Sequence, residues 1–292
     1  MSHPQLGKVG LLLAGGGARG VYTQGYLKAW QELGFEYDVI YGSSVGALCG
    51  ALFHQKDYDK LDWLWNNVKT EDVYKIDMWS ILGAFGKKAS LFDSSPLAKT
   101  IDKLLDYDKL VANPKDFWIN ATDVTNWEPY SREVKTLKNK QEVATLLRGS
   151  ASPPIAFEPI TFDNRQLVDA GLVNNFSITQ ATHDKCDTLV IMTPTRVEPQ
   201  PIRNVLDQFS LLTSVPEYNY FARELKCVTI INTLIEKVNE SLEPDYRPIK
   251  IVIVKPPAPT GIDLLKFEYK DRKALIDHGY NIAKEILQKE LM

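Results

Sequence analysis

The stretch that decides the fold is Lys8-Val9-Gly10-Leu11-Leu12-Leu13-Ala14, followed at once by Gly15-Gly16-Gly17-Ala18-Arg19-Gly20. Its first half is a continuous apolar run, which is typical of a parallel strand buried on both faces. Residues 21–33 then carry apolar side chains at helical spacing, and Gly34 ends this predicted helix. Three consecutive glycines at a helix start present backbone N–H groups with no side chains in the way, so this loop could hold an oxyanion.

A second motif, Gly42-Ser43-Ser44-Val45-Gly46, reads G-x-S-x-G. A β-rich run at 37–41 precedes it, and a helical apolar pattern at 47–53 follows. Strand, tight turn and helix in this order form the context in which a serine hydroxyl is pushed outward. Ser44 is therefore the candidate nucleophile.

The two motifs belong to one predicted βαβ unit. The right-handed crossover of such a unit puts the carboxyl ends of both strands at the same edge of the sheet. We therefore expect the glycine loop to lie within a few ångströms of Ser44, at the positive end of a helix dipole.

A rival interpretation uses the same glycines. Gly15, Gly17 and Gly20 also spell G-x-G-x-x-G after a strand, which is the dinucleotide-binding fingerprint. That fingerprint requires an acidic residue at the end of the second strand, to bind a ribose. Here Glu36 and Asp38 come before that strand, and Gly42-Ser43-Ser44 occupies its end. A nicotinamide or flavin site is thus the weaker alternative. A further alternative is that the glycines serve only close packing of the helix on the strand.

Composition excludes several classes of protein. The 292 residues are 44% hydrophobic and 24% charged with a net charge of −3, as in ordinary globular proteins, and this charge predicts no nucleic-acid partner. The three cysteines share no C-x-x-C spacing, so neither a disulfide framework nor a metal site is expected, and no cofactor is predicted. The N-terminus resembles no signal peptide and no apolar run approaches 18 residues, so we expect a soluble cytoplasmic protein.

Strands alternate with helices along the whole chain. Further strands are expected at 117–122, 188–192 and 249–254, and long helices at 217–242 and 270–291. This order predicts an α/β fold, a three-layer α/β/α sandwich with a mainly parallel central sheet. We expect a single domain over residues 1–292, with the motifs in about 8–195 and residues 196–292 packed on them.

Residues 73–92 are rich in large apolar side chains but have no sustained period. Two interpretations stay open for this segment. In the first, the segment is a lid or channel wall that makes transient contact with an anionic membrane surface. Lys87 and Lys88, close in sequence to Trp79 and Phe85, suit such a contact. Alternatively, it is a buried excursion of the domain.

A serine nucleophile needs a proton acceptor. No histidine sits at a strand end with the look of a triad member, although two of them satisfy the chain order Ser…Asp…His; the four are His3, His54, His183 and His278. Asp169 does follow a predicted strand and precedes a pair of small residues. An aspartate in that position is either a base or an ordinary turn or helix cap.

Several motifs in this order resemble the patatin-like phospholipases, and more narrowly the bacterial patatin-family proteins. They are the glycine run at 15–20, Gly-Ser-Ser-Val-Gly at 42–46, Ala-Thr-Asp at 121–123, Ser-Ala-Ser-Pro-Pro at 150–154 and Val-Asp-Ala-Gly-Leu-Val-Asn-Asn at 168–175. The resemblance covers roughly residues 8–195. Its motif glycines are Gly15, Gly20, Gly42, Gly46 and Gly171.

The resemblance implies a lipid acyl-ester hydrolase with a Ser–Asp dyad and an acyl-enzyme intermediate. Ser44 would be the nucleophile and Asp169 the base, and the oxyanion hole would come from Gly16, Gly17 and Arg19. The family's usual triplet is Asp-Gly-Gly or Asp-Gly-Ala, whereas this chain has Ala170 in the middle. If that position needs a positive φ, alanine is strained there, and a patatin-fold scaffold without activity stays open as an alternative.

Overall fold

The computed structural model describes residues 6–76, 90–195, 221–237, 239 and 247–292, and every structural statement below concerns these residues. Residues 77–89, the centre of the predicted lid, lie outside the described residues. So do His3 and the ends of the helix expected at 217–242; the described residues of that helix are 221–237 and 239.

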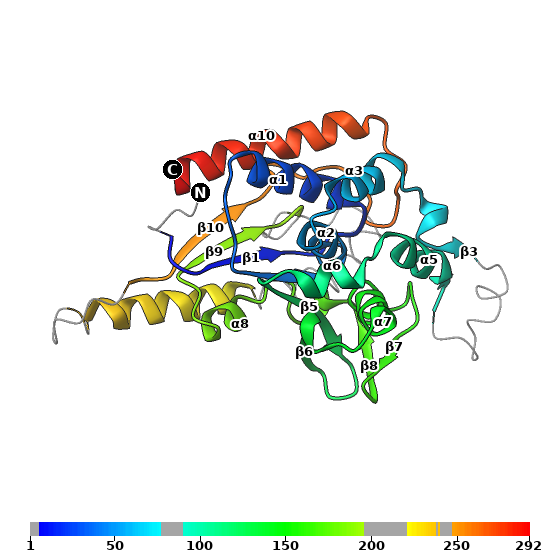
Figure 1. Ribbon diagram of the computed structural model, residues 1–292, viewed down its shortest axis with the longest axis horizontal. Coiled ribbons are helices and arrows are strands. Elements are labelled where there is room, and N and C mark those ends of the chain that lie inside the picture. Colours follow the sequence, from blue (N-terminus) through cyan, green and yellow to red (C-terminus); the bar gives the residue numbers. More distant parts are fainter. Residues whose placement is uncertain (1–5, 77–89, 196–220, 238, 240–246) are drawn as a thin grey trace.

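The core is an eight-stranded sheet in the order β10-β9-β1-β2-β5-β8-β7, with β6 paired to β5 (Figure 1). Five strands run parallel: β1 (Val9–Leu13), β2 (Val39–Ser43), β5 (Asp116–Asp123), β9 (Thr188–Met192) and β10 (Lys250–Val254). The other three pair antiparallel at one side: β6 (Glu128–Glu133), β7 (Ile160–Phe162) and β8 (Arg165–Val168). The mainly parallel α/β sheet expected from the sequence is confirmed.

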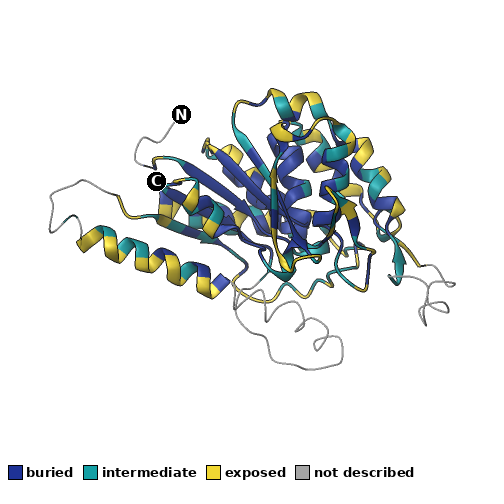
Figure 2. Cartoon of the chain, turned by 90° about the horizontal axis from the view of Figure 1, so that it is seen from below, coloured by how far each residue is buried: buried dark blue, intermediate teal, exposed yellow. Residues whose placement is uncertain are grey.

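Helices cover both faces of the sheet, as the continuous apolar strands require. Side chains of β1 alternate between two cores: Leu11 and Leu13 join one cluster, and Leu12 joins the other. The larger cluster packs under α1 (Gly20–Glu32), α2 (Val45–His54) and α10 (Arg272–Leu291). The smaller one packs under α8 (Ile178–His183) and the helical residues 221–237, on the opposite side (Figures 1 and 2).

The remaining elements lie around this three-layer centre. The helices are α3 (Tyr58–Asn67), α5 (Ser95–Leu104), α6 (Tyr107–Ala112) and α7 (Lys140–Ser150). Short 3₁₀ turns span Gly17–Arg19, Thr70–Asp72, Val134–Thr136 and Ala170–Leu172. A two-stranded hairpin of β3 (Lys75–Ile76) and β4 (Phe92–Asp93) brackets the undescribed part of the predicted lid.

Side-chain caps fix where several helices begin. Asp57, Asp106, Asn139 and Asp271 each accept a hydrogen bond from a backbone N–H three residues on, at the starts of α3, α6, α7 and α10. Such caps satisfy donors that the first turn leaves without partners. In the described part of the chain no helix is long and apolar enough to cross a membrane, and no group of side chains is arranged to hold a metal ion.

Candidate active site

Ser44 occupies the sharp turn between β2 and α2. Its backbone has φ 52° and ψ −127°, a conformation that L-residues rarely adopt and that turns the chain directly from strand to helix. The turn is tight enough to exclude side chains on both sides: a Cβ on Gly42 would lie 2.6 Å from Ala47 Cα, and one on Gly46 would lie 2.2 Å from Leu13 O. These contacts explain the glycines of the G-x-S-x-G motif.

Asp169 meets Ser44 across the sheet edge. The Ser44 hydroxyl donates to Asp169 Oδ2 at 2.6 Å, and Gly171 N donates to the other carboxylate oxygen at 2.8 Å. Strand β8, which ends just before Asp169, pairs with the end of β5. The Asp169 backbone is fixed there because its N–H donates to Ser152 O at 2.9 Å and its carbonyl accepts from Thr122 Oγ1 at 3.0 Å.

The environment of Asp169 raises its basicity. Burial raises the pKa of this carboxyl to about 6 from an ordinary value of 3.8, although the hydrogen bonds from Ser44 and Gly171 act in the lowering direction. A carboxylate with a pKa near 6 is still ionised at neutral pH, and it accepts a proton more readily than an exposed aspartate. The pair therefore has the composition of a nucleophile and its base.

Ala170 does not strain the site. It is fully buried and opens a 3₁₀ turn, and it is not among the residues with positive φ in the described chain. Alanine is thus compatible with this position, and the concern raised by the sequence is removed. The tight position is the next one, because a Cβ on Gly171 would approach Asp169 Oδ1 to 3.1 Å.

The glycine loop touches Ser44, the candidate nucleophile. A Cβ on Gly15 would lie 2.8 Å from Ser44 Cβ, and Gly15 N donates to the buried Asn175 Oδ1 at 2.6 Å. Gly16 and Gly17 have φ values of 158° and 54°. Among the described residues, nothing accepts a hydrogen bond from the N–H groups of these two glycines, so both donors are available beside Ser44.

Arg19 is engaged differently from the two glycines. Its backbone N–H donates to Gly16 O at 3.1 Å, and its Nε donates to Ile262 O at 2.9 Å. The first bond closes the 3₁₀ turn of the loop and the second ties the loop to the C-terminal part of the chain. Gly16, Gly17 and Arg19 remain the predicted residues of the oxyanion hole, and Arg19 in addition ties the loop to the C-terminal part of the chain.

Two polar residues at the site have roles that the sequence motifs did not reveal. Ser150 Oγ accepts a hydrogen bond from Ser44 N at 2.8 Å, and Asn175 holds Gly15 as described above. Both side chains are buried, and buried polar groups need partners. Ser150 lies in the Ser-Ala-Ser-Pro-Pro motif and Asn175 ends the 168–175 motif, so the sequence marked both segments. It did not reveal their partners, Ser44 and Gly15, which are far away in the chain.

The described histidines lie elsewhere. His54 is buried against Tyr37, whose hydroxyl is 3.1 Å from His54 Nδ1, and burial lowers the pKa of this imidazole to about 4. His278 pairs with the Tyr22 hydroxyl at 3.0 Å. His183 is exposed, and no hydrogen bond joins any of the three described histidines to Ser44 or to Asp169.

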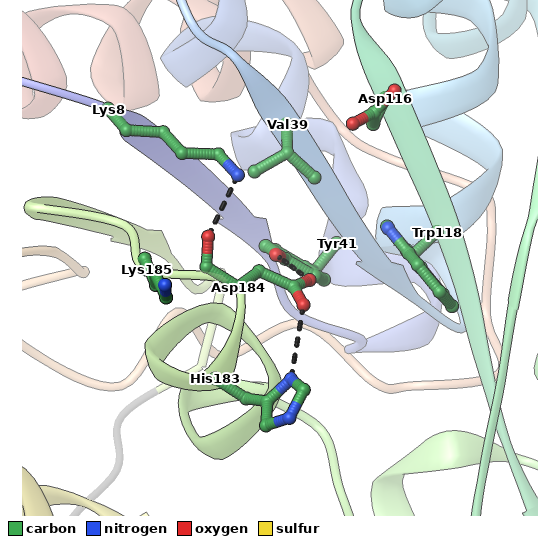
Figure 3. Close-up of a pocket in the computed structure, with 8 residues that line it drawn as sticks. All are labelled: Lys8, Val39, Tyr41, Asp116, Trp118, His183, Asp184 and Lys185. Carbon is green, nitrogen blue, oxygen red and sulfur yellow. Dashed lines mark hydrogen bonds and ion pairs between the residues drawn. The ribbon is translucent and has the colours of Figure 1, made fainter.

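His183 lines an open pocket of 310 Å³ at the opposite edge of the sheet (Figure 3). Strands β1, β2 and β5 contribute to it from their amino-terminal ends, whereas Ser44 follows the carboxyl end of β2. Its polar lining is paired internally, since Asp184 accepts the Tyr41 hydroxyl at 2.6 Å and its carbonyl accepts Lys8 Nζ at 2.8 Å (Figure 3). This pocket is separate from the Ser44 site.

Several known proteins are similar to this chain in sequence or in structure. It is similar to Lysophospholipase NTE1 of Candida glabrata, at 25% identity over 89% of this chain, and to that of Kluyveromyces lactis, at 29% identity over 61% of this chain. The chain spans only 15% and 12% of the length of those two proteins. Among solved structures, VipD from Legionella pneumophila superposes with a TM-score of 0.48 at 13% identity, covering 98% of this chain and 67% of that one.

A family model described as patatin-like phospholipase matches residues 11–182. That range contains the glycine loop, the G-x-S-x-G turn and Asp169. The chain belongs to the patatin-like phospholipase family.

Proposed function

We propose that this chain hydrolyses acyl esters of lipids through Ser44 and Asp169, with no histidine in the reaction. The observation that carries the proposal is the 2.6 Å hydrogen bond from Ser44 Oγ to Asp169 Oδ2, beside a loop with two unengaged backbone donors. Membership of the patatin-like phospholipase family supports a lipid substrate.

The first half of the reaction forms an acyl-enzyme. Ser44 Oγ attacks the ester carbonyl carbon while Asp169 Oδ2 accepts the hydroxyl proton. The negative charge that develops on the carbonyl oxygen is stabilised by the N–H groups of Gly16 and Gly17. The intermediate then collapses, the bond to the alcohol breaks, and Asp169 returns its proton to the departing oxygen.

The second half reverses these roles with water. A water molecule attacks the acyl carbon while Asp169 accepts its proton, and the same loop stabilises the second oxyanion. Release of the fatty acid regenerates the Ser44 hydroxyl with the proton that Asp169 gives back. One carboxylate therefore serves as base and then as acid in each half, which its raised pKa of about 6 favours at near-neutral pH.

Two exposed apolar side chains support contact with a lipid surface. Ile76, in β3, is 68% exposed, and Ile155, next to β4, is 56% exposed; both lie at the base of the predicted lid. Leu91 N donates to Ile155 O at 2.8 Å, so these segments are joined. Ile155 comes three residues after Ser152, whose carbonyl accepts a hydrogen bond from Asp169 N. The exposed Ile155 side chain thus belongs to a loop that also contacts the proposed dyad.

The direct test is turnover. Purified protein is incubated with a short p-nitrophenyl ester and, separately, with lysophospholipid and diacyl phospholipid, and released fatty acid is measured by mass spectrometry. Ester cleavage with an acylated Ser44 trapped by acid quenching is the expected result. Absence of fatty acid release from every substrate, with protein that is folded by circular dichroism, would contradict the proposal.

The pH dependence follows from the raised pKa of Asp169. Below about pH 6 this carboxyl is protonated and cannot accept the Ser44 proton, so kcat/KM for a neutral ester is expected to rise tenfold per pH unit and level off above about pH 6. The measurement is kcat/KM between pH 4.5 and 8.5 at constant ionic strength. A profile that falls as the pH rises through this range would mean that the protonated carboxyl is the active form.

Gly16→Ala tests the oxyanion donors. A Cβ at this position would lie 2.7 Å from Pro194 Cγ, and alanine rarely adopts a φ of 158°, so the loop must shift. Loss of one oxyanion donor lowers kcat by about 10²–10³-fold, and we expect a loss in that range for the p-nitrophenyl ester.

Gly34→Ala is the matched control for this substitution. Gly34 also has a positive φ, 73°, but an added Cβ there has nothing within 4 Å and lies at the end of α1. The control is expected to lose a little stability and to keep wild-type kcat. Equal kcat values for the Gly16 and Gly34 variants would remove the glycine loop from the mechanism.

A further inference from the structure

A segment from the C-terminal part of the chain lies against the glycine loop. Residues 262–269 follow β10 and lead into α10 (Figure 1), and two of their groups hold the Ala18 peptide from both sides. Ala18 N donates to Leu264 O at 2.8 Å, and the Tyr269 hydroxyl donates to Ala18 O at 2.5 Å. Both hydrogen-bonding groups of this peptide residue are therefore fixed by residues some 250 positions away in the sequence.

The approach between the loop and the segment is close. A Cβ on Gly17 would lie 2.2 Å from Leu264 O, so only a glycine fits there. The Arg19 guanidinium adds a third contact through its bond to Ile262 O. The segment thus packs directly against the turn that carries Gly17, one of the two proposed oxyanion donors.

The segment is itself anchored on its other side. Thr70 donates from its N–H and its hydroxyl to the Glu268 carboxylate at 3.0 and 2.7 Å, and its hydroxyl oxygen accepts from Phe267 N at 3.1 Å. The Tyr74 hydroxyl donates to Leu265 O at 3.0 Å. These bonds tie residues 265–268 to Thr70 and Tyr74, so the segment that contacts the glycine loop is itself held from a second side.

We propose that residues 262–269 hold the oxyanion loop in its active geometry, with Tyr269 as the positioning residue. The proposal rests on the proposed hydrolase function of Ser44 and Gly16. Oxyanion donors act only when they lie about 2.7–3.1 Å from the developing charge, so a small rotation of the turn weakens them. Residues 262–269 lie outside the range 11–182 that matches the family model, so this support belongs to the rest of the chain.

Tyr269→Phe tests the proposal because it removes one hydroxyl and keeps the ring. The Ala18 carbonyl then loses its hydrogen bond, and the turn that carries Gly16 and Gly17 is held less firmly, by the remaining bonds to Leu264 O and Ile262 O. We expect kcat for a short monomeric ester to fall about tenfold or more, with KM within twofold of the wild type, because the lost interaction matters only in the transition state.

Tyr107→Phe is the matched control. The Tyr107 hydroxyl also donates to a backbone carbonyl, Leu137 O at 2.7 Å, but this bond joins the start of α6 to the residue after the 3₁₀ turn Val134–Thr136 and does not involve the glycine loop. Similar thermal stability of the two variants with a loss of kcat only in Tyr269→Phe supports positioning. A fall in kcat for Tyr269→Phe no larger than that for Tyr107→Phe overturns the proposal.

A double variant separates positioning from general damage. Gly16→Ala already displaces the donors, so adding Tyr269→Phe is expected to lower kcat by much less than Tyr269→Phe does alone. If the fold losses in kcat of the two single variants simply multiply in the double variant, Tyr269 does not act through the glycine loop. If Tyr269→Phe does not fold, Arg19→Met, which removes the tether to Ile262 O, takes its place in the same cycle.

These outcomes are distinct from failure of the proposed function. Wild-type protein without turnover that depends on Ser44 removes the hydrolase function, and the positioning role falls with it. Active wild type with an equally active Tyr269→Phe variant removes only the positioning role.

Discussion

Ser44→Ala is expected to abolish ester hydrolysis, with a fall in kcat on the order of 10⁴-fold or more. The variant has no group that can form the acyl bond, and water held by Asp169 is a poor substitute. The fold should survive, because the Ser44 backbone keeps its hydrogen bond to Ser150 Oγ and only the bond to Asp169 is lost. The measurement is kcat for a p-nitrophenyl ester, together with labelling by a fluorophosphonate probe.

Ser43→Ala is the control for this experiment. Ser43 is the neighbouring serine and is fully buried, and its hydroxyl donates to Asn174 O at 3.4 Å and accepts from Asn120 Nδ2 at 3.3 Å. These are contacts within the core, so the variant should lose some stability while it keeps both turnover and labelling. Labelling that persists in Ser44→Ala and disappears in Ser43→Ala would transfer the nucleophile to Ser43.

The local part of this site was predictable from the sequence. A strand, a G-x-S-x-G turn and a helix are contiguous, and the glycines at 42 and 46 reflect contacts with the backbone of α2 and of β1. The glycine loop was placed beside Ser44 by a rule of sheet topology, and the register Leu13↔Gly42 bears this out. Periodicity and turn chemistry were sufficient because all the partners lie within 50 residues.

The rest of the site could not be predicted because its contacts are long-range. Asn175 is 160 positions from Gly15, and Ser150 is 106 positions from Ser44. Residues 262–269 have no motif at all, yet their backbone carbonyls fix the glycine loop. A backbone carbonyl carries no signature in the sequence, so only the folded chain reveals such a support.

The choice of base also depended on the structure. From the sequence, Asp169 was favoured because no histidine sat at a strand end, and a turn or cap role remained open. In the structure one carboxylate oxygen of Asp169 accepts Gly171 N at the start of a 3₁₀ turn, which is the cap role, and the other accepts the Ser44 hydroxyl, which supports the proposed role as base. We therefore expect His183→Gln and His278→Gln to keep nearly full activity.

Asp169→Asn is expected to abolish turnover and, at the same time, to stabilise the protein. The amide cannot accept the Ser44 proton, so kcat should fall by several orders of magnitude. The folded pKa of Asp169, about 6, is higher than the ordinary 3.8, which means that the folded state prefers the neutral carboxyl. This difference corresponds to a penalty of up to about 3 kcal/mol on the free energy of unfolding once the carboxyl is ionised.

The sign of the effect fixes its pH dependence. The penalty is absent below about pH 4, grows as the pH rises from about 4 to about 6, and is complete above that value. Asparagine, which never ionises, should therefore raise the free energy of unfolding by about 1–3 kcal/mol at pH 7.5 and by almost nothing at pH 4. Thermal or urea unfolding at the two pH values measures the difference.

Asp123→Asn gives the opposite expectation at a neighbouring strand end. Burial acts to raise the pKa of Asp123, but hydrogen bonds from Thr125, Arg165 and Asn126 outweigh it and lower the pKa. Its ionised form is therefore stabilising above its unfolded pKa, and the asparagine variant should lose stability at pH 7.5. If Asp169→Asn lost stability at pH 7.5 as Asp123→Asn does, the carboxylate of Asp169 would be a structural anion, and the raised pKa on which its role as base depends would be wrong.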